Sequence, residues 1–357
     1  MALIWADGFD HYGTSPNGGR DAMLAGAWAA FSWANGTAHE VSAAQARTGT
    51  HSLRHSYNSL ATGGIQARRV LGAAQIVVGC AAGWYFNSLP GVNAVHGFEF
   101  RNNANNAIAT ITIQSDGALG LYVGASRTFL AASDPIISAS SWQHIEAKIV
   151  CDTVVGECEI RVNGVTVLHV TDQNLGSLGC TQIVFGIPGS RSGGNLTYYT
   201  DDIVVWNDVG DDNNDFIGQC RVETIFPVAD TAQADWTLVG DSDGFDCIDN
   251  VPPDGDTTYI QGANVGDISQ FELDDLPPET AKIIGVYIPV MAKIDDAGVG
   301  AVKTGLLSGS DLALSGELTL TTAYTYWGAV FERDPATDEP WTKTGLEAAL
   351  LHIEKSA

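Results

Sequence analysis

The stretch Ser141–Val170, SWQHIEAKIVCDTVVGECEIRVNGVTVLHV, decides the fold that the sequence predicts. Apolar and polar residues alternate from Trp142 to Cys151 and again from Cys158 to Val162. Asn163-Gly164 then supplies two residues that tolerate positive φ, as a two-residue type I′ hairpin requires, and Val165–Val170 forms the returning strand. A period of two places apolar side chains on one face and polar side chains on the other, so the stretch predicts three consecutive antiparallel strands that cover a core. The sequence therefore predicts an all-β sandwich.

The composition of the whole chain fits this fold and argues against several classes of partner. With 357 residues, 45% hydrophobic residues and 40 glycines, the chain is long enough for two cores built from short strands and tight turns. The formal net charge of −25 argues against a nucleic-acid partner, because binding to phosphates requires clustered Lys and Arg. The same charge argues against docking on an anionic membrane.

Strand-like segments recur at regular spacing along the chain, with almost no helical periodicity. The last segment of the first set, Tyr198–Trp206, is followed by the polar, acidic and Gly-containing segment NDVGDDNNDFIG. We predict two β-sandwich domains. Residues 1–207 form the first, residues 208–218 form an acidic linker, and residues 219–357 form a smaller and more acidic second sandwich.

The sequence indicates a chain made in a reducing compartment. No segment pairs a basic stretch with the apolar core of a signal peptide, and no apolar run reaches the ~18 residues of a membrane span. We therefore expect cytoplasmic synthesis without a signal peptide and without membrane insertion. The six cysteines lack CxxC spacing, which argues against a zinc knuckle or a redox pair. Cys151 and Cys158 fall on adjacent predicted strands, so both a cross-strand disulfide and buried free thiols fit the pattern.

Four motifs resemble one known family. They are LIWADGFDHYGT (3–14), RTGTHSLRH (47–55), SWQHIEAKI with IRVNGVTVL (141–149 and 160–168), and YYTDDIVVW (198–206). In these motifs the chain resembles the concanavalin-A-like (laminin-G-like) lectin/glucanase sandwich, in the version found in bacteriophage virion and tail-associated proteins. The FELDDLP and DPATDEPWT segments are similar to the C-terminal part of such phage structural proteins. The resemblance spans most of the chain and its motifs are mainly structural.

The resemblance implies a concanavalin-A-like jelly roll for the first domain and a place in a virion. It implies a non-enzymatic virion structural protein, a minor component of the tail, fibre or decoration type, with host-surface glycan as a ligand. Other virion proteins and further copies of the chain would be its partners. Two alternatives stay open: a glycan-degrading tail enzyme, and a purely structural decoration protein that binds no sugar.

Catalytic motifs are scarce in the sequence, and this favours the absence of enzymatic activity. Glucanases of this fold carry an ExDxE motif on one strand, and the chain has none. Glu157 and Glu159 share a face of one predicted strand, but we assign that face to solvent. The segment Gly240–Gly244 matches GxSxG as text, yet its serine lies between two aspartates and no helix is predicted after it.

Calcium is the one cofactor that the acidic segments favour, because closely spaced carboxylates suit this ion. Asp201 and Asp202 lie on the last predicted strand of the first domain, and Asp208 and Asp211 follow in the linker. We take these four residues as the calcium candidates, with solvated acidic turns as the alternative. A second acidic loop, without EF-hand spacing, contains Asp241, Asp243, Asp246 and Asp249.

Aromatic rings near Gly-rich loops are the candidates for glycan binding, because rings stack on the apolar faces of sugars. Four N-terminal residues fit this description: Tyr12, Trp28, Trp33 and Tyr57. Packing in the core is the alternative for each of them.

Overall fold

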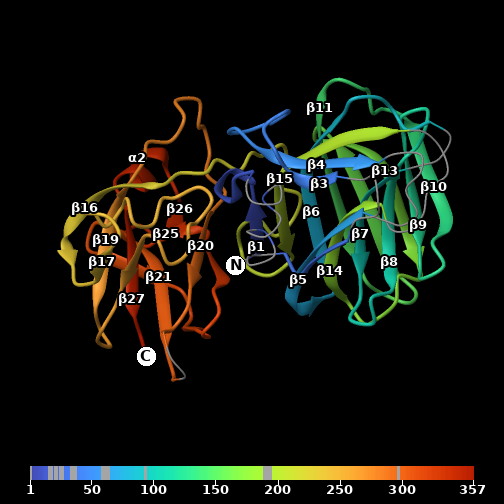
Figure 1. The fold of residues 1–357 in the computed structure, drawn as a ribbon. Helices are drawn as coiled ribbons and strands as arrows, with labels where there is room; N and C mark the ends of the chain where they lie inside the picture. Colours follow the sequence, from blue (N-terminus) through green and yellow to red (C-terminus); the bar gives the residue numbers. More distant parts are fainter. Residues whose placement is uncertain are drawn as a thin grey trace.

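The computed structural model describes residues 2–14, 19, 23, 28–32, 38–57, 65–91, 95–187, 195–295 and 298–357. Over these residues the chain is almost entirely β, and the strands pair into antiparallel sheets (Figure 1). The predicted all-β sandwich fold is therefore confirmed. Across this part of the chain, no helix has the length and hydrophobicity that crossing a bilayer requires.

The first part of the chain forms two large sheets that enclose a common core. Sheet A has the strand order β13-β12-β11-β6-β15-β4-β3, with β1 paired to β15, and sheet B has the order β10-β9-β8-β7-β14-β5-β2. The strands of sheet A are β1 (Leu3–Asp7), β3 (Ala38–Ser42), β4 (Ser52–Tyr57), β6 (Val77–Phe86), β11 (Trp142–Val150), β12 (Gly156–Val162), β13 (Val165–Gln173) and β15 (Leu196–Asn207). The strands of sheet B are β2 (Ala30–Ser32), β5 (Ile65–Gln75), β7 (Val95–Arg101), β8 (Ala107–Ile113), β9 (Ala118–Val123), β10 (Thr128–Pro135) and β14 (Cys180–Ile187). A short 3-10 helix, η1 (Asp10–Tyr12), follows β1.

The hairpin predicted at Asn163-Gly164 is present. β11 pairs with β12, and β12 pairs with β13 so that Val162 lies opposite Val165. Asn163 and Gly164 have φ values of 50° and 83°, the left-handed region that a type I′ turn needs at both central positions. The sequence thus predicts this three-stranded unit correctly.

Large aromatic side chains fill the space between sheets A and B. Trp84, Phe98 and Phe185 have no exposed surface, and their ring centroids lie 6.2–6.3 Å apart. Full burial of one such side chain stabilises the fold by roughly 1.5–3 kcal/mol. All six cysteines are free thiols, so the disulfide alternative for Cys151 and Cys158 is not realised.

The C-terminal part of the chain forms a second, smaller set of sheets (Figure 1, orange and red). Sheet C has the order β16-β19-β27-β21-β22, with β23 paired to β21, and three two-stranded sheets accompany it: β17–β18, β20–β24 and β25–β26. The elements are β16 (Pro227–Ala234), β17 (Thr237–Val239), β18 (Tyr259–Gln261), β19 (Ile268–Leu273), β20 (Val286–Ala292), β21 (Ala301–Ser308), β22 (Asp311–Leu314), β23 (Leu318–Thr319), β24 (Thr325–Phe331), β25 (Arg333–Asp334), β26 (Glu339–Pro340), α2 (Lys343–Glu347) and β27 (Leu350–Lys355). Thr342 caps α2, since its Oγ1 accepts a hydrogen bond from the Gly345 amide at 3.0 Å.

The segment predicted as a linker packs against the outer face of sheet A. The centroids of the Phe216 and Trp206 rings lie 6.2 Å apart, and the Gly218 amide donates a hydrogen bond to Glu146 Oε1 at 3.0 Å. As a result Glu146 has no exposed surface and His144 is 1% exposed, although the alternation of β11 predicts a solvated face for both. The prediction failed there because a segment some 70 residues further along the chain covers this face.

The N-terminal strand joins the two parts of the molecule. β1 pairs with β15 of sheet A, while the amides of Ala2 and Leu3 donate to the carboxylate of Glu332 at 2.9 and 3.1 Å. Figure 1 shows β1 between the two sets of sheets. The division into domains at 207 and 219 stays a prediction, and we refer below to the first sandwich (residues 1–207) and the C-terminal unit (219–357).

Candidate functional site

One row of cross-strand neighbours crosses the outer face of sheet B. Phe129 of β10 pairs with Tyr122 of β9, Tyr122 with Thr110 of β8, and Thr110 with Glu99 of β7. The row continues over β14 to Arg68 of β5. Directly paired residues point to the same face, and strands lie ~4.8 Å apart, so these six strands give a row about 24 Å long. We call it the sheet-B row.

Glu99 is the polar centre of the sheet-B row. It is 1% exposed, and its two carboxylate oxygens are fully engaged. Arg127 donates Nε to Oε2 at 2.6 Å and Nη2 to Oε1 at 3.0 Å, which is the bidentate geometry of a strong ion pair. Thr110 Oγ1 donates to Oε2 at 2.6 Å, and Arg101 Nε donates to Oε1.

The charges at this centre do not cancel. Burial raises the pKa of Glu99, but hydrogen bonds from Arg127 and Thr110 and the charge of Arg101 outweigh it, so the net shift is downward and the carboxylate is ionised at neutral pH. The hydrogen bond to Glu99 raises the pKa of Arg127 in turn. Two guanidinium groups on one carboxylate leave a net charge of about +1. Because the Arg127 side chain is 35% exposed, this charge is open to solvent.

Arg127 keeps hydrogen-bonding capacity for a ligand. A guanidinium has five N–H donors, and the two bonds to Glu99 use one on Nε and one on Nη2. A carboxylate or sulfate group matches the fork of such donors. Glu99 therefore holds Arg127 in place with a planar, charged donor set partly exposed.

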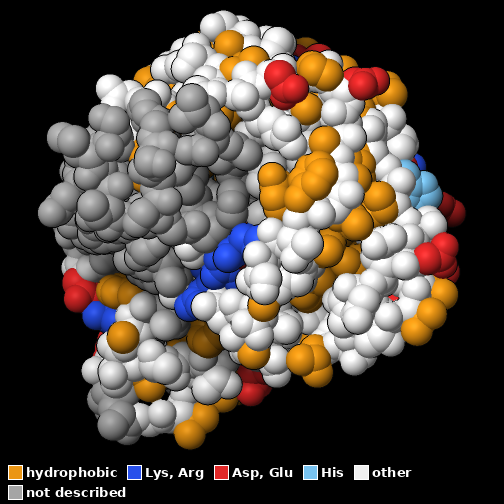
Figure 2. All heavy atoms as spheres, turned by 90° about the vertical axis from the view of Figure 1, so that its right-hand side faces the viewer, with side chains coloured by type: hydrophobic (Ala, Val, Ile, Leu, Met, Phe, Trp, Pro, Cys, Tyr) orange, Lys and Arg blue, Asp and Glu red, His pale blue; other side chains and the backbone are white. Residues whose placement is uncertain are grey.

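Two aromatic side chains lie at the β9–β10 end of the row. The rings of Tyr122 and Phe129 meet edge to face with centroids 5.4 Å apart, and Phe129 is 53% exposed. Figure 2, which faces the side of the molecule with β9 and β10, shows Lys and Arg side chains beside hydrophobic ones. Exposed rings next to cationic donors can contact both the apolar face and the charged substituents of a sugar.

The structure does not support a role in glycan binding for the aromatic residues that the sequence selected and the structure describes. Tyr12, Trp28 and Tyr57 are each 1% exposed and belong to the core. The Tyr12 hydroxyl and Trp28 Nε1 donate to the buried Asp7 carboxylate at 2.8 and 2.9 Å, so both act inside the fold. Trp33 lies outside the described residues.

The four aspartates selected for calcium do not come together. Asp201 and Asp202 have no exposed surface, whereas Asp208 and Asp211 are exposed. Asp201 Oδ2 accepts the Arg47 amide at 2.7 Å. Burial and the neighbouring Asp202 raise the pKa of Asp201 to about 9.

Both carboxylate oxygens of Asp202 accept hydrogen bonds within the protein. Its Oδ1 accepts the Val222 amide at 2.9 Å, and its Oδ2 accepts Thr48 Oγ1 at 3.0 Å and an Arg47 guanidinium N–H. These two aspartates therefore link the 47–48 turn to the segment that enters the C-terminal unit.

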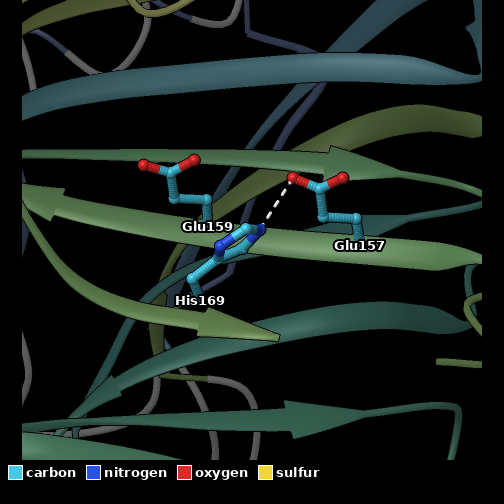
Figure 3. Close-up of side chains that lie close together, drawn as sticks. All are labelled: Glu157, Glu159 and His169. Carbon is cyan, nitrogen blue, oxygen red and sulfur yellow. Dashed lines mark hydrogen bonds and ion pairs between the residues drawn. The ribbon is translucent and has the colours of Figure 1, made fainter. Parts of the chain in front are cut away.

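Two other acidic groups have ligand atoms close enough to share an ion. Figure 3 shows one of them, where His169 Nε2 lies 2.9 Å from Glu157 Oε1 and Glu159 lies beside it. Arg161 Nε also donates to Glu159, at 2.7 Å. The second group, from the second acidic loop of the sequence, consists of Asp241, Asp243 and Asp246. In the first group Glu159 is only 12% exposed and is paired with Arg161, whereas the second group is largely solvent-accessible, as ordinary surface carboxylates are.

The sequence reasoning missed Glu99, Arg101 and Arg127. One signal for the first two was present: GFEFR (97–101) places two charged residues at i and i+2, hence on one face, inside an apolar strand. Arg127 carried no such signal, because only the pairing of β7, β8 and β9 brings it to Glu99.

Comparison with known proteins gives a likeness of fold. No protein-family model matches the chain, and no curated protein matches its sequence. Similar solved structures include an endo-β-1,4-glucuronan lyase from the fungus Trichoderma reesei, with 13% identity, 50% of this chain and 90% of that chain covered, and a TM-score of 0.42. The cellulose-induced protein Cip1 (17% identity, 50% and 90% coverage, TM-score 0.41) and the alginate lyase Aly36B (14% identity, 56% and 95% coverage, TM-score 0.40) are also similar.

This comparison contradicts one expectation from the sequence. The scarcity of catalytic motifs favours a chain without enzymatic activity, but the glucuronan lyase and the alginate lyase are enzymes. Similar solved structures also give no link to a phage. Because the TM-scores lie below 0.5, the likeness does not assign an activity, and we argue the chemistry from the residues of this chain.

Proposed function

We propose that the chain binds an acidic polysaccharide at the β9–β10 end of the sheet-B row and cleaves it. The observation that carries the proposal is the exposed Arg127 guanidinium, held by the buried Glu99 in the same row as the Tyr122–Phe129 ring pair. In a chain with a net charge of −25, a locally positive site attracts an anionic ligand that the rest of the surface would repel. The accessible part of the row is its β9–β10 end, where Phe129 is 53% exposed and Tyr122 and Arg127 are partly exposed, so a sugar would bind there.

The donor set favours a sugar that carries a carboxylate. Arg127 would pair with this carboxylate and neutralise its charge. Neutralisation makes the proton on the adjacent carbon easier to remove, since fixed positive charge stabilises the negative charge that develops on the carboxyl group. Tyr122 lies two strands from Glu99 along the row, and its phenol is the candidate to transfer a proton.

Cleavage by β-elimination is the reaction that this arrangement supports best. The C–H bond next to the carboxylate breaks, a C=C bond forms, and the glycosidic oxygen leaves with a proton. Atoms and charges balance without a further reactant. Each cut creates one unsaturated sugar end and one new reducing end.

Polysaccharide digestion tests the proposal. The purified chain is incubated with a polyuronate and with a neutral β-glucan, and unsaturated ends are followed by ultraviolet absorbance alongside a reducing-end assay. We expect cleavage of the polyuronate only. Arg127→Ala should lower the rate by about 10²-fold, the usual effect of removing one donor that stabilises developing charge. Tyr122→Phe should abolish cleavage while polyuronate binding persists.

Arg54→Ala is the matched control. Arg54 forms a cross-strand pair with Glu40 at 2.8 Å on sheet A, and its side chain is 34% exposed, close to the 35% of Arg127. This variant should cleave as the wild type does. Equal binding of charged and neutral polymers, or full activity of Arg127→Ala, would show that the site lies elsewhere.

The association with a phage particle stays a proposal that rests on the sequence resemblance alone. Self-association, docking on other virion proteins and attachment to host-surface glycan belong with it. Mass spectrometry of purified particles would test this association separately from the activity.

A further inference from the structure

One imidazole and two carboxylates meet on the outer face of sheet A, at the β12–β13 hairpin (Figure 3). Glu157 and Glu159 stand two residues apart on β12, so both side chains point to the same face. His169 of β13 is the direct cross-strand partner of Glu159. One ligand atom from each of the three residues lies within 4.8 Å of the other two. The strand pairing therefore places a nitrogen donor and two oxygen donors around one point.

Glu159 is held in position by two neighbouring side chains. Thr166 Oγ1 donates to Glu159 Oε1 at 2.6 Å, and Arg161 Nε donates to the same oxygen at 2.7 Å. Arg161 is itself fixed, since its guanidinium carbon lies 3.7 Å from the centroid of the Phe216 ring. Because both donors bind Oε1, Oε2 is the oxygen that Glu159 offers to a cation. Outer partners of this kind orient the ligands of metal sites and strengthen binding.

The charge of these three residues favours a cation. Burial raises the pKa of Glu159, but the hydrogen bonds from Thr166 and Arg161 outweigh it, so the net shift is downward and the carboxylate is ionised at neutral pH. Glu157 and Glu159 then carry two negative charges, of which Arg161 balances one. His169 Nε2 lies 2.9 Å from Glu157 Oε1, the distance of a shared proton. A divalent ion would replace that proton and neutralise the remaining charge.

The donor types favour zinc among the common divalent ions. Calcium takes about 6–8 oxygen ligands and magnesium requires an octahedral shell of oxygens, whereas this set has three donors and one of them is nitrogen. Zinc combines His nitrogen and carboxylate oxygen at about 2.0–2.2 Å in a tetrahedral site, which puts neighbouring ligand atoms ~3.4 Å apart. Side-chain rotation closes the difference between this spacing and the 4.8 Å limit within which the three atoms lie.

We propose that Glu157, Glu159 and His169 bind one zinc ion, with the fourth position open to solvent. Glu157 and His169 are partly exposed, so an ion can reach them. Three protein ligands and one open position form the arrangement of zinc sites that hold a water molecule or a further ligand. The site lies on sheet A and shares no residue with the sheet-B row, so it is independent of the proposed cleavage of polysaccharide.

Zinc titration of the full, metal-free chain against a chromophoric chelator tests the proposal. We expect one ion per chain in the wild type. His169→Ala and Glu159→Gln should each weaken binding at least tenfold, because each removes one of the three ligands. Zinc should raise the melting temperature of the wild type and leave that of His169→Ala unchanged, since only an ion bound to the folded state stabilises it. Circular dichroism of the metal-free variants shows that they are folded.

Two control variants separate this site from other candidates. Asp243→Asn changes the all-oxygen group of the second acidic loop, and Cys220→Ser changes a thiol whose Sγ lies 3.5 Å from His144 Nε2, another pair of zinc-ligand types. Both variants should bind zinc as the wild type does. No binding by the wild type, or unchanged affinity of His169→Ala, would overturn the proposal. Loss of binding in Cys220→Ser with retention in His169→Ala would place the ion at the Cys220–His144 pair instead.

Discussion

In the first sandwich Trp84 and Phe98 have no exposed surface, whereas in the C-terminal unit Val290 and Leu351 remain half-buried although strands lie on both sides of them. The relative widths of the facing sheets explain this difference in burial. Sheets A and B have similar numbers of described strands and cover each other. The β20–β24 ribbon is roughly 10 Å wide, while sheet C, at about 4.8 Å per strand, is more than twice as wide. Closure of a core thus depends on matched sheet widths as well as on apolar content.

Truncating one core residue in each part should give the largest contrast. Phe98→Ala removes a fully buried ring and should lower the free energy of unfolding by about 3–5 kcal/mol. Leu351→Ala removes a side chain that is only partly buried against the C-terminal core, so about 1–2 kcal/mol is expected. Urea unfolding of the full chain, followed by tryptophan fluorescence, measures both. Equal losses would show that the C-terminal core is as tightly closed as the first.

Acid should destabilise the first sandwich through histidines that it buries. Desolvation, and then the Arg47 charge, lower the pKa of His144 to about 3. The unfolded chain binds this proton below pH 6.5 while the folded chain does not, so stability falls as the pH drops from about 6.5, by up to ~1.4 kcal/mol per pH unit.

A histidine variant isolates this effect. His144→Gln should reduce the loss of unfolding free energy between pH 6.5 and 4.5 by about 2–3 kcal/mol, measured by urea unfolding at each pH. His169→Gln makes the same substitution at an exposed position, 43% accessible, and the difference between the two variants is the quantity measured. Identical slopes for both variants would mean that carboxylates alone set the acid response.

The ion pair between Arg333 and Asp212 should matter least. Arg333 Nε lies 2.6 Å from Asp212 Oδ2, but the side chains are 37% and 28% exposed, so solvent screens their attraction. A double-mutant cycle with Arg333→Ala and Asp212→Ala should give a coupling energy of about 0.2–1 kcal/mol. A coupling above about 2 kcal/mol would show that this pair fastens the C-terminal unit to the preceding segment.

Local patterns predicted local structure well. The alternation around Asn163-Gly164 predicted β11, β12 and β13. Burial of Glu146 could not be predicted in this way, because the Gly218 amide that binds it arrives from a distant segment.

The candidate site shows the same limit. Glu99 and Arg101 form a visible pair on one strand, but Arg127 joins them only through the register of three strands. Tyr12 and Trp28 were selected as exposed rings because they stand near glycines. Their hydrogen bonds to the buried Asp7 depend on tertiary packing, which composition does not encode.

The placement of β1 has a consequence for the order in which the chain acquires its structure. Its strand partner, β15, begins nearly 200 residues later, and the amides of Ala2 and Leu3 bind Glu332, which lies 330 and 329 residues away. Contacts between residues so far apart in sequence form late in folding, because closing a long loop of chain costs conformational entropy. β1, which precedes the other described strands in the chain, is therefore among the last to find its place, and until then the β15 edge that it covers stays open to other chains.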